Sequence, residues 1–203
     1  MALVVAMIVI LLAMPPRIAL TQTPTATTPL VPAAKAQISG FGIAGTLNLR
    51  QKSNGYILVD AVLQGDPKTL TPGLHGFHIH ETGACEEKTP TPFSSAKGHF
   101  DPGPFGSSVP VEANHPYHLG DLPNLTVDES GRGTLKTVTS RFSLSSSPVS
   151  LFDRDGSAVI LHKLIDQSKT GGTAAEAGGG RLACGVIEAV KEEECRLCNL
   201  FKP

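Results

Sequence analysis

A stretch of eight residues at positions 73–80, Gly-Leu-His-Gly-Phe-His-Ile-His, constrains the fold of this 203-residue chain more than any other. In its second half, apolar residues alternate with histidine. Successive side chains of a β-strand point to opposite faces, so His78 and His80 share one face and Phe77 and Ile79 the other. The pattern predicts a strand that turns apolar residues toward a core and presents two imidazoles together on its other side.

The composition favours a β-rich domain with many loops over a helical bundle. Aromatic residues make up 5% of the chain, and the 21 glycines and 16 prolines indicate many turns. Short strands are predicted at residues 43–49, 56–63, 125–127, 133–138, 142–144, 159–161 and 181–190. The net charge of -1 gives no argument for a nucleic acid or an anionic membrane surface as partner.

The N-terminal region has the composition of a targeting segment followed by a linker. Residues 1–20 include an uncharged apolar run that matches the core of a secretory signal and is shorter than the ~20 residues that span a bilayer. Residues 21–36 are rich in Thr, Pro and Ala, which predicts an extended tether. We expect a protein exported to the periplasm or the extracellular space, either cleaved or still attached to a membrane through this segment.

The folded domain is expected over residues 37–190, with a charged C-terminal tail over 191–203. The four cysteines lie at positions 85, 184, 195 and 198. An even number suggests disulfides in an exported protein, and the sequence alone allows three pairings. The Cys-x-x-Cys pair of the tail, Cys195 and Cys198, is compatible with a local disulfide, with two exposed thiols or with a link between chains.

The histidines are spaced in a way that is typical of metal ligands. Four nitrogens in a flattened arrangement suit Cu(II), and four histidines of this chain can supply them: His78, His80, His99 and His162. A second set offers two nitrogens and one oxygen: His115, His118 and Asp121. With one shared histidine, this second set becomes a four-coordinate site that suits zinc.

Several blocks of the sequence resemble the copper/zinc superoxide dismutase family, and they occur in the order of that family. The blocks are residues 44–49, 51–54, 73–81, 99–102, 118–122 and 180–186, together with His162. Separate blocks in the right order are far more specific than one short motif. The resemblance extends over residues 38–190 and implies an all-β fold, an eight-stranded Greek-key β-sandwich or flattened barrel with two long functional loops.

The resemblance also implies roles for individual residues. It implies copper on His78, His80, His99 and His162, and zinc on His99, His118 and Asp121, with the ring of His99 bridging the two metals. Arg181 corresponds to the active-site arginine, Asp166 to an aspartate that hydrogen-bonds ligand histidines, and His75 to a structural histidine. Cys85 and Cys184 correspond to the intrachain disulfide of the family.

The chain departs from the family pattern in both long loops. The remaining zinc histidine is missing from its usual place shortly after the bridging one, and we assign His115 to that role. The loop over residues 163–180 is shorter than in familiar members, and its two lysines, Lys163 and Lys169, match no position that guides the substrate.

The function expected from these features is the dismutation of superoxide to dioxygen and hydrogen peroxide by a redox-cycling copper linked through His99 to zinc. Arg181 would bind the superoxide anion, and His99 would carry a proton. The alternatives are a copper-only or zinc-poor variant of the same fold and a non-catalytic exported copper-binding module. A homodimer is compatible with the sequence, which does not determine the oligomeric state.

Overall fold

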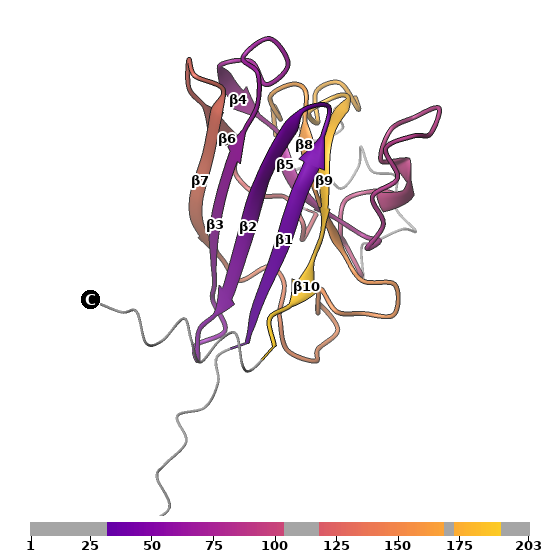
Figure 1. The fold of residues 1–203 in the computed structure, drawn as a ribbon. Coiled ribbons are helices and arrows are strands. Elements are labelled where there is room, and N and C mark those ends of the chain that lie inside the picture. The colour runs from indigo at the N-terminus through magenta and orange to yellow at the C-terminus, as the bar shows by residue number, and fades with distance from the viewer. Residues whose placement is uncertain (1–31, 104–117, 169–172, 192–203) are drawn as a thin grey trace, which may run out of the picture.

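The computed structural model describes residues 32–103, 118–168 and 173–191 (Figure 1). These ranges contain β-strands and one short 3-10 helix, and no α-helix. The elements are β1 (Ala33–Gly40), β2 (Ile43–Gln51), β3 (Ile57–Gln64), β4 (Gly73–His75), β5 (Phe77–His80), η1 (Ser94–Ala96), β6 (Leu125–Val127), β7 (Arg132–Thr139), β8 (Ala158–His162), β9 (Arg181–Val186) and β10 (Glu188–Ala189). The predicted all-β class is confirmed. Across the same ranges, no helix has the length and hydrophobicity required to cross a bilayer.

The 73–80 segment forms both ends of one continuous antiparallel sheet. The strand order is β4-β6-β7-β3-β2-β1-β9-β8-β5. β4 pairs with β6 through His75 and Leu125, whereas β5 pairs with β8 through His78 and Ile160. Because β4 and β5 are consecutive pieces of one segment, the sheet is nearly closed into a barrel and exposes little unpaired edge.

Gly76 lies where this segment passes from one end of the sheet to the other. A Cβ atom at this position would lie 3.1 Å from Cε1 of His78 and 3.3 Å from Cβ of His162, which is tighter than ordinary packing. The backbone of Gly76 also accepts a hydrogen bond from the N–H of His162 (2.8 Å) and donates one to the carbonyl of Leu164 (2.8 Å). The absence of a side chain therefore lets the crossing point pack directly against the end of β8.

The strand count agrees with the predicted eight once two interrupted strands are recognised. β4 and β5 are halves of one strand, and β10 continues β9 along β1, since Cys184 pairs with Ser39 and Glu188 pairs with Lys35. β3 lies beside β7, although the β4–β5 strand and β6 separate them in the chain. This order of four antiparallel strands is a Greek key.

Two local predictions differ from the structure. β1 begins at Ala33, and Ala34 and Ala36 are buried, so residues 33–36 belong to the sheet and not to the tether. Alternating alanines carry a weak hydrophobic signal, which is why composition alone assigned them to the linker. Residues 142–144 form no strand; Phe142 and Leu144 are buried by packing, with a single bridge from Ser143 to Ser150.

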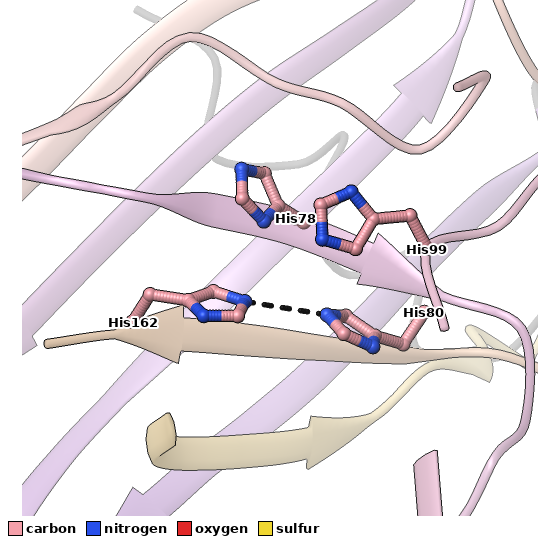
Figure 2. A group of neighbouring side chains, drawn as sticks. All are labelled: His78, His80, His99 and His162. Atoms are coloured by element: carbon pink, nitrogen blue, oxygen red, sulfur yellow. Dashed lines mark hydrogen bonds between the residues drawn. The ribbon is translucent and has the colours of Figure 1, made fainter. Parts of the chain in front are cut away.

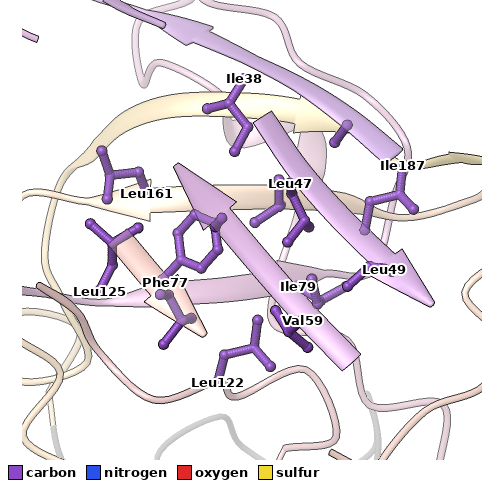
Figure 3. Packing of buried hydrophobic residues seen from close by; sticks show 14 of the residues in the cluster. Ile38, Leu47, Leu49, Val59, Phe77, Ile79, Leu122, Leu125, Leu161 and Ile187 are labelled. Atoms are coloured by element: carbon purple, nitrogen blue, oxygen red, sulfur yellow. The ribbon is translucent and has the colours of Figure 1, made fainter. Parts of the chain in front are cut away.

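The interior of the barrel is filled by the inward-facing residues of the alternating strands (Figure 3). β3 shows the pattern clearly, because Ile57, Val59 and Ala61 are buried while the residues between them are partly exposed. Phe77 and Ile79 of β5 point into the same cluster and are fully buried. The core therefore fixes β5, the strand that carries two of the predicted copper ligands.

Candidate metal centre

The structure brings the four histidines predicted for copper into one buried cluster, here called the four-histidine group: His78, His80, His99 and His162. Each ring offers one nitrogen, and the four nitrogens lie within 4.8 Å of one another (Figure 2). β5 contributes two of these rings, the end of the neighbouring strand β8 contributes His162, and a β-bridge to His80 places His99. Residues up to 84 positions apart in the chain thus converge on one point.

Three of these rings are oriented from outside by oxygen acceptors. Nε2 of His78 donates to Oδ2 of Asp166 (2.8 Å), Nδ1 of His80 donates to the carbonyl of Lys97 (2.9 Å), and Nδ1 of His162 donates to the carbonyl of Gly179 (3.1 Å). Because a neutral imidazole carries one N–H, the opposite nitrogen of each ring presents a lone pair to the cluster.

The inner nitrogens of the four-histidine group fit a cation. Nδ1 of His78 is buried and has no hydrogen-bond partner. Nε2 of His80 lies 3.3 Å from Nε2 of His162, so two lone pairs face each other inside the cluster (Figure 2). Buried acceptors facing one another are costly unless a proton or a metal ion lies between them. Four imidazole nitrogens are the donor set that copper favours.

A second group, here called the mixed group, consists of His99, His118 and Asp121, whose ligand atoms also lie within 4.8 Å of one another. Oδ1 of Asp121 lies 2.7 Å from Nδ1 of His99, and Oδ2 lies 3.5 Å from Nδ1 of His118. His99 belongs to both groups, and its ring centroid lies 4.1 Å from that of His78 and 5.1 Å from that of His118. One imidazole with two nitrogens can therefore serve both groups.

The protonation states of the two groups suit cation binding. Burial, strengthened by the neighbouring imidazoles, lowers the pKa values of His80 and His162 well below the usual value and that of His99 to about 4. Burial raises the pKa of Asp121, but hydrogen bonds to the two histidines of the mixed group outweigh it and keep the pKa below its usual value. At neutral pH these rings are neutral and the carboxylate is charged, as metal ligands must be.

Arg181 is held beside the four-histidine group by the backbone of the 93–97 segment. Its Nη1 donates to the carbonyl of Phe93 (2.6 Å) and its Nη2 to the carbonyl of Lys97. The carbonyl of Lys97 also accepts from His80, so one peptide oxygen links the guanidinium to the cluster. Arg181 is half-buried, which places a fixed positive charge at the border between the cluster and solvent.

The predicted disulfide between Cys85 and Cys184 is present, and it joins positions 99 residues apart. Cys184 lies on β9 three residues after Arg181, and Cys85 belongs to the same loop as Phe93. The disulfide therefore ties the loop that holds the guanidinium to the strand that carries it. A second predicted structural residue, His75, has both ring nitrogens directed at carbonyl oxygens, those of His162 (2.9 Å) and Thr71 (2.8 Å).

The structure also reveals contacts that the sequence pattern did not indicate, and it leaves one predicted residue undescribed. The carbonyl of Lys97 and the amide of Asn124, which bonds the backbone of Asp166, were not predicted. A backbone carbonyl leaves no residue-type signal, and a single Asn in a turn is common. His115 lies within residues 104–117, which are outside the described residues. Cys195 and Cys198 also lie outside them, in residues 192–203.

Comparisons with known proteins agree with this geometry. The family model described as "Copper/zinc superoxide dismutase (SODC)" matches residues 43–187. "Superoxide dismutase [Cu-Zn] 1" of Salmonella typhimurium (strain 4/74) is 36% identical over 123 residues, which is 59% of this chain and 66% of that protein. "Superoxide dismutase [Cu-Zn]" of Deinococcus radiodurans is 36% identical over 127 residues, covering 60% of this chain and 66% of that protein. The aligned part thus spans just under two thirds of these relatives.

A solved structure shares the fold. The crystal structure of the clock protein EA4 superposes with a TM-score of 0.59 at 30% sequence identity. The match covers 82% of this chain and 99% of that chain. The barrel described above is therefore an architecture already observed by crystallography.

Proposed function

The chain belongs to the copper/zinc superoxide dismutase family, and we propose that it converts superoxide to dioxygen and hydrogen peroxide. The single observation that carries the proposal is the convergence of two buried ligand groups on one shared imidazole, that of His99. A storage site for copper needs neither a second group nor a guanidinium held at its border. The dismutation mechanism proposed here uses both.

In the proposed assignment, copper is bound by the four-histidine group and zinc by the mixed group. The mixed group supplies two nitrogens and one oxygen, and His115 is proposed to complete the four-coordinate set that zinc prefers. Nδ1 of His99 lies beside Asp121, which leaves Nε2 as the nitrogen that belongs to the four-histidine group. His99 is thus proposed to bridge the two metals.

Copper, when bound, supplies one-electron redox chemistry, so that one superoxide loses an electron and a second superoxide gains it. The residues of the chain supply binding and protons. Arg181 is fixed by the carbonyls of Phe93 and Lys97 and offers its remaining N–H groups to the anion as charge-assisted donors. A neutral imidazole carries one N–H, and Nδ1 of His99 faces Asp121, so Nε2 is the proposed site where one proton is held and then passed to the reduced oxygen species. Solvent water would supply the second proton of hydrogen peroxide.

Metal analysis combined with superoxide turnover tests the proposal. About one copper and one zinc per chain together with rapid superoxide consumption supports it. Copper and turnover without zinc would move the protein to the zinc-poor variant, and bound copper without turnover would make it a copper-binding module. The role of His115 has its own test: His115→Ala should lower the zinc content and leave copper bound, and unchanged zinc content would contradict that assignment.

The location of the protein is also a proposal. The apolar leader over residues 1–20 and the Cys85–Cys184 disulfide both support export, because disulfides persist in oxidising compartments. Fractionation of cells that produce the full chain should place it outside the cytoplasm. Membrane association after high-salt washing would support attachment through the N-terminal segment.

A further inference from the structure

Asn124 lies outside both ligand groups, yet its side-chain amide makes two hydrogen bonds to one residue of the site. Nδ2 donates to the carbonyl of Asp166 (2.9 Å), and Oδ1 accepts from the N–H of Asp166 (2.8 Å). Neighbouring β-strands exchange the same pair of hydrogen bonds, one to a carbonyl and one from an N–H. Here the side-chain amide of Asn124 takes the place of the second strand. Both backbone groups of Asp166 are satisfied by Asn124, so the position of this residue depends on it.

Asn124 is itself attached to the rigid part of the molecule. It directly precedes β6, whose first residue, Leu125, is fully buried. Three residues earlier, the carbonyl of Asp121 accepts from Nη1 of Arg141 (3.2 Å), and the carbonyl of Gly120 accepts from the N–H of Ile79 on β5 (2.9 Å). The 120–125 segment therefore forms a fixed support beside β5.

The segment that carries Asp166 is tied to the barrel backbone at Leu164, whose carbonyl accepts from the N–H of Gly76 (2.8 Å). Residues 163–167 pair mainly with residues 176–180 of the same loop, through bonds such as Leu164 N–H to Gly178 (2.8 Å) and Gln167 N–H to Glu176 (2.8 Å). Leu164 is 45% exposed. The Asn124 amide thus connects this loop to the fixed support at the residue whose carboxylate holds His78.

The carboxylate of Asp166 transmits this position to His78. Oδ2 accepts from Nε2 of His78 (2.8 Å), while Oδ1 accepts from the N–H of Ser168 (2.7 Å), so both oxygens are oriented. The ring of His78 is fully buried, and the bond at Nε2 decides that Nδ1 points into the four-histidine group. Bonds of this kind to the outer nitrogen of a ligand set ring orientation and metal affinity.

We propose that Asn124 is a positioning residue of the copper site, acting through Asp166 on the ring of His78. The inference rests on the proposed assignment of copper to the four-histidine group. Loss of the amide leaves every ligand in place but releases the backbone of Asp166. The copper affinity should therefore fall by about 10- to 100-fold, the range typical of lost outer partners of metal ligands.

The test compares copper binding by the full chain with and without this amide. The Cu(II) dissociation constant is measured by competition with a chelator, and the visible absorption band of the Cu(II)-loaded protein reports the ligand geometry. Asn124→Ala should weaken binding and shift the band. Asn124→Asp has the same shape but lacks the donor to the carbonyl of Asp166, so it should also weaken binding even if the alanine variant folds poorly.

Gln51→Ala is the matched control. Its amide is also half-buried and also fixes a loop, accepting from the N–H of Leu144 (2.7 Å), but that loop contributes no residue to either ligand group. It should lower the melting temperature without changing copper affinity or the absorption band. A purely structural role for Asn124 predicts the same result for Asn124→Ala, and that result would overturn the inference.

A double-mutant cycle separates this inference from the proposed function. If Asn124 acts through Asp166, then adding Asn124→Ala to Asp166→Ala should cause no further loss of copper affinity. Full additivity would contradict the pathway. A wild-type chain that binds no copper would instead refute the proposed function, and an inference that depends on that site would be refuted with it.

Discussion

The two faces of β5 are equally buried but are stabilised in different ways. Phe77 and Ile79 on one face and His78 and His80 on the other are all 0% exposed. The apolar face needs only close contact with the core, whereas each imidazole needs a polar partner supplied by a distant loop. Burial alone therefore does not distinguish scaffold from site. Substitutions on the two faces should therefore have different effects. Those on the apolar face should lower the free energy of unfolding, and those on the histidine face should lower metal content and activity.

The largest expected effect is on the histidine face. His80→Ala removes a nitrogen of the four-histidine group. Superoxide turnover should therefore fall by more than the roughly 100-fold typical of losing a residue that only hydrogen-bonds a metal ligand. The metal-free protein should keep most of its stability. Stopped-flow superoxide decay and calorimetry of the metal-free form measure the two quantities. A variant that retains its activity would remove His80 from the site.

The apolar face should give the opposite result. Phe77→Ala leaves a large cavity among residues of the core and should lower the free energy of unfolding by about 3–5 kcal/mol. Under conditions where the variant is folded, the copper and zinc contents should match the wild type. Denaturant titration and metal analysis provide the test, and selective loss of copper at full stability would show that the two faces are not separable.

The pH dependence of the metal-free protein tests the cost of burying the imidazoles. The pKa of His99 is about 4 in the folded state and 6.5 as its reference value, so between these values the unfolded chain binds more protons. His99 alone should therefore account for roughly 3 kcal/mol of stability lost as the pH decreases from 6.5 to 4. His80 and His162, whose pKa values are also lowered by burial, add to the loss in the same direction. Thermal melts of the metal-free protein across this range measure it. His99→Gln should flatten the slope, and an equally steep slope in that variant would assign the effect to other groups.

The smallest effect belongs to a conservative change on the apolar face. Ile79→Val removes one methyl group from a fully buried position and should cost about 0.5–1.5 kcal/mol. Neighbouring His78 and His80 lie on the other face, so metal affinity should not change. A measured change in copper affinity would show that packing on one face adjusts ligand geometry on the other.

Much of this comparison was predictable from the sequence. The two-residue alternation in 77–80 identified both faces, and the order of the motif blocks indicated the barrel and the residues that converge. Alternation depends only on neighbouring residues, and a motif is defined by its residue types and their spacing. Both can therefore be recognised in the sequence without a structure. The same is true of Cys85 and Cys184, although their pairing came from the family resemblance.

Other features depend on tertiary structure and leave little trace in the sequence. The role of Gly76 follows from what packs against it, and a glycine between histidines has no unique meaning on its own. The hydrogen bonds of Asn124 join positions 42 residues apart, so no local sequence pattern predicts them. The strand start at Ala33 was missed because alanine is weakly hydrophobic, and 142–144 was wrong because apolar residues can be buried without pairing.

The near-closure of the sheet by a single segment has a thermodynamic consequence. Separating β5 from β8 would part His78 and His80 from His162, so opening the barrel along this line and dismantling the four-histidine group are one event. A cation bound by residues of both strands stabilises the closed barrel over the opened one by an amount set by its free concentration relative to its dissociation constant. Hydrogen exchange of the β5 and β8 amides should therefore slow sharply on metal loading, more than in β2 or β3. The bound metal would then hold together the two strands that form its own site.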